Sequence, residues 1–481
     1  MAGSRVRSHR GRRPAVAPGR SSLRPAPAAA ARLAGSKSAS FPGRNALIGL
    51  AALGALIVLF GWASATGSQP IVSLADGLNA AGRVTGLLGT YLVLWQLLLM
   101  ARVPALERAV GMESLLRLHR LNAYAALSLI VAHAVFQTAG YAAANHLGPM
   151  TQLSSFISGF EGMLMAVVAL GLMLLVTILS VAAAKRRIAY HTWYFIHLYA
   201  YLAVALATVH ELAIGTDFLG RPWYTAYWVA LYAVTATLLL WFRVGAPFRL
   251  LGRHRLRVAR VEREANGISS LYLQGRNLAQ LHLQPGQFML WRFLDRERWW
   301  EAHPFSVSSL PNPRFIRLTV RASGDFSRRL SKVVPGTPVM LEGPFGRFTA
   351  GSSEAEKVLL IAGGIGITPI RPLAEHLARE GREVRVLYRC QRERELAFRA
   401  EFDQLSAELP LTVDYLVGEQ VAGDSRRGHW SDAAALSRRV PDVQEREVYL
   451  CGPQGLMDKL LRSLTTLSLA PAQVHVEAFR F

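Results

Sequence analysis

Four histidines in two long apolar stretches have the residue type and spacing that could bind iron-containing cofactors. His119 and His133 stand 14 residues apart (133 − 119), and His197 and His210 stand 13 apart (210 − 197). An imidazole inside a hydrocarbon span is costly, so four of them need a reason. At about 1.5 Å per residue, the two members of each pair are about 20 Å apart along their helix. Two such helices could hold two hemes stacked across a bilayer, with each iron taking one histidine from each helix.

The two pairs differ in helical phase. Fourteen residues at about 100° each bring His133 back to within roughly 40° of the face of His119. Thirteen residues leave His210 about 140° from the face of His197, so we expect a π-bulge, a kink or a different side-chain reach in that span. A lone membrane histidine is often a polar group that bonds between helices. Two pairs at nearly equal spacing favour iron ligation instead.

The composition divides the chain into a membrane half and a soluble half. Of its 481 residues 51% are hydrophobic, and they are concentrated in the first half. The formal net charge of +22 could indicate a nucleic-acid partner, but the basic residues fall in a tail and in loops beside apolar stretches. That distribution is typical of a membrane protein obeying the positive-inside rule, so we expect no nucleic-acid partner. Only Cys390 and Cys451 are cysteines, which excludes a disulfide framework and an iron–sulfur site.

Six apolar stretches predict six membrane spans, with the lipid bilayer as their partner. The expected spans are about 45–63, 84–100, 119–139, 160–184, 192–212 and 223–242. A short loop holding Asp76 is expected between the first two. Residues 1–44 are rich in Arg and contain no acid, which predicts a disordered basic tail, with an organellar transit peptide as the alternative. The Ala-, Arg- and Gly-heavy usage favours a bacterial cell membrane.

Loop charge predicts the orientation of the chain. Basic residues gather after the second, fourth and sixth spans, at Arg102, Arg108, Arg117, Arg120, Lys185, Arg186, Arg187, Arg243, Arg249, Arg253 and Arg255. The positive-inside rule therefore places the N-terminus and the soluble half in the cytoplasm. His119 and His197 then belong to the inner leaflet, and His133 and His210 to the outer one. These are the two pairs that we expect to share a heme.

Two patterns follow each other in the soluble half. Short alternating runs at about 256–264, 268–275, 286–293, 305–310, 314–322 and 337–346 predict a small antiparallel β-barrel. From Lys357 onward strands alternate with helices, which predicts a parallel, Rossmann-like sheet. Gly363, Gly364 and Gly366 follow the first of these strands and would let the backbone approach a pyrophosphate. A tight structural turn is the alternative reading of these glycines.

These motifs together carry a resemblance. The soluble half resembles the ferredoxin–NADP reductase superfamily, and the whole chain resembles the ferric reductase and NADPH oxidase family. The resemblance implies that FAD is bound along the stretch His303, Pro304, Phe305 and Ser306, which would line the isoalloxazine and ribityl part. It also implies that Arg321 and Ser327 hold the FAD pyrophosphate. The turn Glu342–Gly346 is similar to the one that closes the family's flavin domain.

The resemblance implies a nicotinamide-nucleotide site and two b-type hemes as well. The nucleotide turn would be formed by Gly363, Gly364, Gly366, Thr368 and Pro369, and the segment beside the nicotinamide by Cys451, Gly452 and Pro453. A C-terminal aromatic, Phe479 or Phe481, would cover the flavin face, so the expected catalytic residues are Cys451, Phe479 and Phe481. The four histidines have the spacings of the family's heme ligands. Arg389 and Arg392 favour NADPH over NADH, although Glu393 and Glu395 interleave with them.

The sequence thus predicts a multi-domain membrane oxidoreductase, with no indication of its oligomeric state. We expect a basic tail over 1–44, a six-helix transmembrane bundle over 45–245, an FAD-binding β-barrel over 250–350 and an α/β NAD(P) domain over 351–481. Electrons would pass from NAD(P)H through FAD and two hemes to an extracytoplasmic acceptor. Ferric chelates are the first expectation for that acceptor. Oxygen reduced to superoxide, and a quinone or protein partner, are the alternatives.

Overall fold

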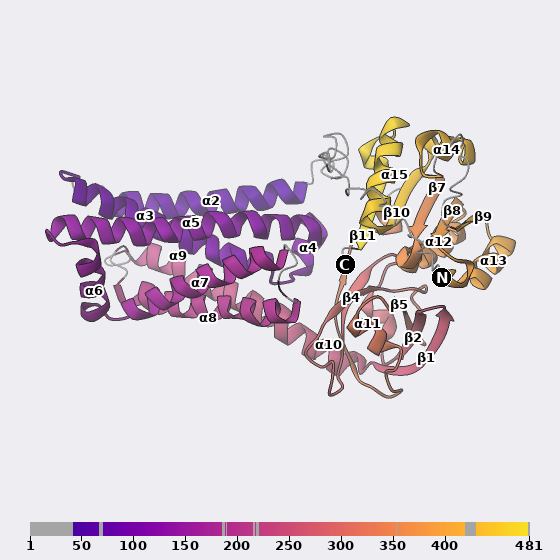
Figure 1. Ribbon diagram of the computed structural model, residues 1–481, viewed down its shortest axis with the longest axis horizontal. Helices are drawn as coiled ribbons and strands as arrows, with labels where there is room; N and C mark the ends of the chain where they lie inside the picture. The colour runs from indigo at the N-terminus through magenta and orange to yellow at the C-terminus, as the bar shows by residue number, and fades with distance from the viewer. Residues whose placement is uncertain are drawn as a thin grey trace, which may run out of the picture.

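A long helical part and two β-containing parts make up the structure (Figure 1). The computed structural model describes residues 42–66, 71–184, 188, 190–214, 217, 221–352, 354–418 and 430–479. The expected basic tail therefore lies almost wholly outside the described residues, and so do Lys185, Arg186 and Arg187. The helices run side by side at one end of the molecule, and both β-containing parts lie at the other end.

Six long helices form the first part. They are α2 (Pro42–Thr66), α3 (Leu74–Leu99), α5 (Met112–Ala144), α7 (Met163–Ala184), α8 (Tyr190–Ile214) and α9 (Pro222–Leu240). Within the described residues six helical stretches are long and apolar enough to cross a membrane, which confirms the six predicted apolar helices. Large apolar side chains such as Leu53 and Phe60 are exposed on their outer surface, as a lipid environment requires.

Several connections were predicted wrongly. Asp76 belongs to the first turn of α3, where Ser73 and Asp76 form a capping box, and not to a loop. A sequence-based hydropathy boundary misses such a start because the capping residues are polar. Arg108 lies in a short helix and Arg117 and Arg120 lie within α5, so they too are not in a loop. The unexpected short helices are α4 (Pro104–Val110), α6 (Pro149–Gly159) and α10 (Ala246–His254).

The predicted distortion of the fifth span does not take the form of a π-bulge. Helix α8 is α-helical throughout Tyr190–Ile214. A π-helical turn, η2, lies instead at Trp241–Gly245, between α9 and α10. The 140° phase difference between His197 and His210 is therefore not removed by an extra residue in a helical turn. A kink in α8 or the reach of the imidazole side chains then has to accommodate it.

Two three-stranded antiparallel sheets form the second part. One has the order β1-β2-β5, with β1 (Arg257–Ala265), β2 (Ile268–Gln274) and β5 (Ile316–Arg321). The other has the order β4-β3-β6, with β4 (His303–Ser306), β3 (Phe288–Phe293) and β6 (Val339–Phe345). Both sheets enclose one core that includes the fully buried Leu271 and Trp291, and isolated bridges link them at Val307–Leu318 and Arg257–Pro338. Closure into a barrel stays a prediction.

A five-stranded parallel sheet forms the third part, in the order β11-β10-β7-β8-β9. Its strands are β7 (Lys357–Gly363), β8 (Glu383–Cys390), β9 (Leu411–Val417), β10 (Glu447–Pro453) and β11 (Val474–Phe479). Alternate residues of β7 enter two different cores: Leu360 packs with α12 (Ile367–Arg379) and α13 (Arg399–Glu408), whereas Leu359 packs with α14 (Ala433–Arg439) and α15 (Gln454–Thr466). Helices therefore cover both faces, as in a doubly wound fold.

Candidate functional site

The structure brings the four histidines together as two facing pairs between α5 and α8. The ring centres of His119 and His197 are 6.3 Å apart, with an angle of 61° between the planes. Those of His133 and His210 are 6.5 Å apart, with an angle of 69°. These are the two pairs that the loop charge predicted. One pair lies about 20 Å from the other along α5.

The gap between the paired rings fits a metal ion held from both sides. A metal–imidazole bond is about 2 Å long, and each ring centre lies about 1 Å behind its nitrogen, so opposed imidazoles on one metal have ring centres about 6 Å apart. Both observed separations, 6.3 and 6.5 Å, are close to that value. Among the described residues no cluster of three or more His, Cys, Asp or Glu could hold a metal alone. The residues present therefore fit a heme that two histidines would hold.

Two of the four rings are oriented by hydrogen bonds from their other nitrogen. Nδ1 of His133 lies 2.8 Å from the carbonyl oxygen of Gly82, which can only accept, so this nitrogen carries the proton. Nδ1 of His197 lies 3.4 Å from Oγ of Ser180, whose own proton is donated to the Val176 carbonyl. In both rings Nε2 is left with a lone pair, as an iron ligand requires.

His119 has a different arrangement, which sequence reasoning missed. Its Nδ1 lies 3.3 Å from the Gln96 carbonyl oxygen, and the side-chain amide of Gln96 lies 3.1 Å from its Nε2. Asn122 fixes that amide by donating to its oxygen at 2.8 Å. Gln96 therefore donates to the lone pair that a metal would take, and ligation at His119 requires exchange of this hydrogen bond. A polar residue in an otherwise apolar span was the signal that could have indicated Gln96.

Glu211 follows His210 directly in the chain but bonds to a different helix. Glu211 accepts a hydrogen bond from the Tyr232 hydroxyl of α9 at 2.5 Å, and does not bond to its sequence neighbour. Neighbours on a helix point about 100° apart, which directs Glu211 away from the His133 side. Among the described residues Nδ1 of His210 is buried without a hydrogen-bond partner.

Gly86 of α3 leaves the space that the His133 ring occupies. A Cβ atom at Gly86 would lie 2.5 Å from Nδ1 of His133, the atom that donates to Gly82. We expect Gly86→Ala to displace the imidazole and to weaken cofactor binding at that pair about 10–100-fold, the usual effect of losing an outer-shell partner. Heme retained per protein during titration with a competing heme-binding protein measures this effect. Gly171→Ala is the matched control, because nothing lies within 4 Å of a Cβ there.

The predicted flavin stretch forms β4 and is held from two sides. The His303 ring stacks on Phe326 with ring centres 3.8 Å apart, and Nε2 of His303 lies 3.1 Å from Glu301. Nε1 of Trp291 donates to the carbonyl of Phe305 at 3.0 Å. Glu301, only 5% exposed, also accepts from Arg329 at 3.1 Å. Sequence reasoning missed Glu301, although the acid stands two residues before the His-Pro-Phe run.

The two residues expected at the FAD pyrophosphate lie on either side of the loop that ends β5. Oγ of Ser327 accepts from the backbone N–H groups of Gly324 and Ser323 at 2.9 and 3.1 Å, so it caps the short helix α11 (Asp325–Leu330). The guanidinium of Arg321 lies 3.8 Å from Glu395 and 3.4 Å from the Cβ position of Gly364. Arg321 therefore reaches from the flavin segment to the nucleotide turn.

The two expected nicotinamide-nucleotide motifs touch through their backbones. Gly364 and Gly366 form the 3-10 turn η5 (Gly364–Gly366), which follows Gly363 at the end of β7. A Cβ at Gly366 would lie 2.1 Å from the carbonyl oxygen of Cys451, and one at Gly452 would lie 3.1 Å from Gly363 Cα. The two backbones therefore pack closely at the start of α12, where Thr368 and Pro369 are buried and Oγ1 of Thr368 donates to the Ile365 carbonyl.

Of the three expected catalytic residues, only Cys451 has a side chain that the structure describes, and that side chain is buried. The Cys451 thiol is completely enclosed, and burial raises its pKa well above the ordinary value, so the thiol form is favoured. Its backbone, with Gly452 and Pro453, forms the end of β10 that meets the nucleotide turn. Phe479 ends β11 beside Pro453, but its side chain and the whole of Phe481 lie outside the described residues.

The two arginines expected at a 2′-phosphate differ in their surroundings. The Arg389 guanidinium donates to the backbone carbonyls of Cys390 and Leu416, the latter at 3.2 Å. It would have to release these carbonyls to meet a phosphate. Arg392 is exposed at the start of the turn η6 (Glu393–Glu395), beyond the end of β8.

A cavity of about 320 Å³ lies between the end of the helical bundle and the predicted flavin stretch. It is lined from α8 and η2 by Tyr194, Tyr201 and Arg243, and from the β-containing part by Trp300, Glu301, His303 and Glu342. Two contacts hold this junction: Arg102 pairs with Glu342, and the buried Glu107 accepts from the Gly346 N–H at 3.2 Å. Burial raises the pKa of Glu107 above its ordinary value, the opposing effect of that N–H bond being smaller. Sequence reasoning missed both contacts.

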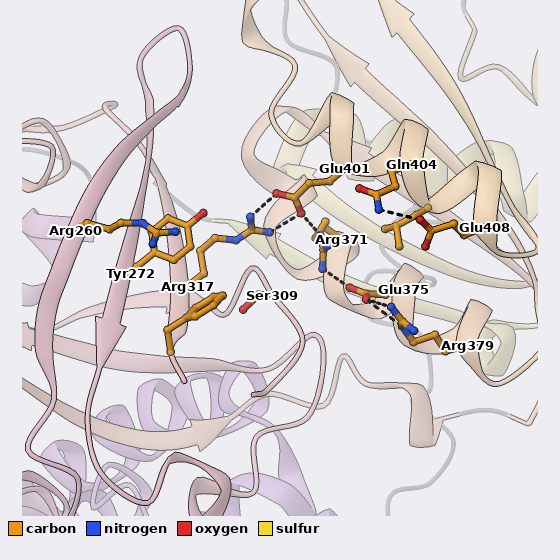
Figure 2. Close-up of a pocket in the computed structure, with 12 residues that line it drawn as sticks. Arg260, Tyr272, Ser309, Arg317, Arg371, Glu375, Arg379, Glu401, Gln404 and Glu408 are labelled. Atoms are coloured by element: carbon orange, nitrogen blue, oxygen red, sulfur yellow. Dashed lines mark hydrogen bonds and ion pairs between the residues drawn. The ribbon is translucent and has the colours of Figure 1, made fainter. Parts of the chain in front are cut away.

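A second cavity, of about 340 Å³, lies between the two β-containing parts (Figure 2). Glu401 of α13 lines it and is paired with Arg317 of β5 and with Arg371 of α12, the latter at 2.6 Å. Arg371 and Arg379 both pair with Glu375, which extends the chain of charges along α12. Glu401 therefore joins the second part of the structure, which contains the predicted flavin stretch, to the third part, which contains the predicted nucleotide turn. We call these the flavin part and the nucleotide part.

Glu401 should make the junction of these two parts sensitive to acid. Burial raises its pKa, but hydrogen bonds and charges from Arg317 and Arg371 outweigh burial and leave the pKa below the ordinary 4.5. A carboxyl with a depressed folded pKa stabilises the fold above that ordinary value and loses this contribution as the pH falls through the folded pKa. Glu401→Gln should therefore lower stability by about 1–3 kcal/mol at pH 7.

Thermal unfolding of the full-length protein measures this difference between pH 7 and pH 4. The difference in stability between wild type and Glu401→Gln should become smaller below pH 4.5, because protonation removes the negative charge of Glu401 in the wild type. Glu408→Gln is the control, since Glu408 lines the same cavity and, within the described part of the chain, its side chain accepts a hydrogen bond only from Gln404. A gap that stays constant over this range would contradict the assignment.

Models of three protein families match parts of this chain, and several known proteins are similar to its second half. Residues 85–208 match the model of the ferric reductase like transmembrane component, 256–361 that of an FAD-binding domain, and 360–461 that of an oxidoreductase NAD-binding domain. A flavohemoprotein of Bordetella pertussis is 27% identical over 308 residues, covering 57% of this chain and 73% of that protein. The glycine betaine monooxygenase reductase subunit of Chromohalobacter salexigens is 26% identical over 242 residues, covering 47% and 64%. The flavohem-like FAD/NAD-binding domain of a nitric oxide dioxygenase from Vibrio cholerae is similar at 24% identity, with a TM-score of 0.39, covering 47% of this chain and 99% of that one.

The matched domains define a class of protein. Six candidate membrane spans joined to FAD- and NAD-binding domains make the protein a multi-pass membrane oxidoreductase that uses NAD(P)H. The three domain models follow one another in the order expected for one family. This combination of domains matches the ferric reductase and NADPH oxidase family that the sequence resembles.

Proposed function

We propose that the protein passes electrons from cytosolic NAD(P)H, through FAD and two b-type hemes, to an acceptor on the other side of the membrane. Ferric chelates are the acceptor that we propose first. The observation that carries the proposal is the presence of two facing histidine pairs between α5 and α8, at ring separations of 6.3 and 6.5 Å. The pairs stand about 20 Å apart along α5, which suits a path across a bilayer core about 30 Å thick.

The residues of the soluble half suit the supply of these electrons. A nicotinamide gives up a hydride and a heme iron takes single electrons, and FAD supplies the conversion when it is bound. His303, Pro304, Phe305 and Ser306 would orient the flavin ring, with Arg321 and Ser327 at its pyrophosphate. The glycine turn Gly363–Gly366 and the Cys451-Gly452-Pro453 segment would position the nicotinamide nucleotide. Arg389 and Arg392 support NADPH as the preferred donor.

The cavity beside His303 supports the order of transfer. It reaches from the flavin stretch to Tyr194 and Tyr201 on α8, the helix that carries His197. Of the two histidine pairs, the one containing His197 is therefore placed nearer the flavin. Loop charge supports a cytoplasmic location for the soluble half, and we propose that His133 and His210 serve the outer heme in a cell membrane.

Purified protein in lipid nanodiscs tests the proposal. We expect a low-spin heme absorption band at two hemes per chain, bound FAD, and ferric-chelate reduction that is faster with NADPH than with NADH. Reduction that is abolished by superoxide dismutase would make oxygen the acceptor, and reduction only of added quinone would assign a carrier role. Full heme content in the His119→Ala/His133→Ala double variant would end the bis-heme proposal.

A further inference from the structure

The loop between β3 and β4 reaches from the flavin part to the helical bundle. The ring of Trp300 lies 5.5 Å from that of Phe195 on α8, at an interplanar angle of 35°. Phe195 is the fourth residue of the candidate span Thr192–Glu211. A span's first turn lies at the boundary between the hydrocarbon core and the headgroups. This loop of the flavin part is therefore level with the surface of the membrane.

The neighbouring residue of the same loop, Trp299, is not covered by protein. Its side chain is 60% exposed. The loop is nevertheless held firmly, because the buried Arg298 donates to Asp295 Oδ2 at 2.7 Å and to the Arg329 carbonyl at 2.7 Å. A fixed loop therefore presents this large apolar ring to the surroundings.

The end of the sixth span provides a second exposed apolar surface in the same region. The candidate span Pro222–His254 has 33 residues, about 50 Å of helix, so its last turns extend beyond a core about 30 Å thick. Val244 and Phe248 are 48% and 61% exposed, four residues apart on one face. Val244 lines the same cavity as Trp300, which places this helix end next to the loop.

We propose that Trp299 and Phe248 form a lipid-binding surface, seated in the headgroup layer of the leaflet that faces the soluble domains. Tryptophan prefers that layer because its ring is apolar and its N–H is polar. The exposed Arg249, Arg253 and Arg296 supply positive charge for anionic headgroups. The surface is continuous with the spanning helices, which makes the lipid bilayer, and not a second copy of the chain or another protein, the partner it fits.

The lipid contact would also fix the position of the flavin stretch. Trp299 is two residues before Glu301, and Glu301 bonds to His303 of β4 at 3.1 Å. Seating Trp299 in the headgroups would therefore add to the Arg102–Glu342 and Glu107–Gly346 contacts that hold this part against the bundle. This role is independent of the identity of the electron acceptor and of heme ligation.

Site-directed labelling of the full-length protein in nanodiscs tests the proposal. A Trp299→Cys variant is labelled with an environment-sensitive fluorophore; the native Cys390 and Cys451 are only 3% and 0% exposed, and unreactive wild-type protein verifies this. We expect lipids that carry a spin label near the headgroup to quench the probe strongly, and aqueous iodide to quench it weakly. Phe248→Cys should behave in the same way and guards against a local effect at position 299.

Val417→Cys is the matched control. Val417 is an apolar residue, 44% exposed, at the end of β9, which lies on the side of the molecule away from the helical bundle (Figure 1). Its probe should show the reverse pattern, with quenching by iodide and none by spin-labelled lipid. Equal behaviour of the probes at positions 299 and 417 would overturn the proposal. Shielding at position 299 that depends on protein concentration and not on spin-labelled lipid would overturn it in favour of a second copy.

Discussion

Replacing His133 with alanine is expected to remove one of the two proposed hemes and to stop the proposed electron delivery across the membrane. His133 faces His210 at 6.5 Å, and its Nδ1 is already committed to the Gly82 carbonyl, so Nε2 is the only nitrogen left for iron. Loss of an outer-shell partner typically costs 10–100-fold in metal affinity, so loss of the ligand should cost at least about 100-fold. We expect heme content to fall by half and chelate reduction to fall about 100-fold or more.

Measuring FAD reduction and chelate reduction separately distinguishes loss of a heme from misfolding of the whole protein. Reduction of bound FAD by NADPH should proceed at the wild-type rate in His133→Ala, because the flavin and nucleotide parts are untouched. His146→Ala is the matched control, since His146 follows α5 in an exposed turn outside both pairs. Two hemes per chain in His133→Ala, measured by pyridine hemochrome, would show that His133 does not bind iron. A similar loss in His146→Ala would point to misfolding.

The membrane half shows which features a sequence can predict. The helices and the histidine pairs were predictable because hydropathy and the cost of a buried imidazole are properties of single stretches. Gln96, Ser180 and the Gly82 carbonyl, which hold three of the rings, were not. They approach the histidines only because α3 packs on α5 and α7 packs on α8, and that packing depends on small residues such as Gly86.

The soluble half shows the same division. Alternating apolar residues predicted the strands of both β-containing parts, since the period of two is a local property. The contacts between the parts could not be predicted from the sequence, because the partners are far apart in the chain. Arg102 and Glu342 are 240 residues apart, and Arg317 and Glu401 are 84 apart. Charged residues of this kind are most often solvent-exposed, so nothing local marks them as partners. The same holds for Arg389, whose guanidinium is directed by backbone carbonyls and not by its neighbours in sequence.

Replacing Gly366 with alanine is expected to abolish productive binding of the nicotinamide nucleotide. The new Cβ would lie 2.1 Å from the backbone oxygen of Cys451 and 2.9 Å from the nitrogen of Gly452. Neither atom can swing away, because β10 is hydrogen-bonded on both sides, to β7 and to β11. The turn must therefore move off the strand, at a cost of about 1–3 kcal/mol, typical of overpacking. If this free-energy cost destabilises the complex with the nucleotide, kcat/KM for NADPH should fall about 10–100-fold.

Two comparisons isolate this effect to the nucleotide turn. Gly455→Ala, on α15 only three residues after Gly452, meets no atom within 4 Å and should leave kcat/KM unchanged. Dithionite, which reduces the cofactors without a nucleotide, should reduce Gly366→Ala as fully as wild type, because the flavin and histidine sites are intact. Wild-type kcat/KM in Gly366→Ala would mean that β10 and the turn can separate without loss. The contact between Gly366 and Cys451 would then be a packing feature of the sheet, and the nicotinamide would have to bind elsewhere along its edge.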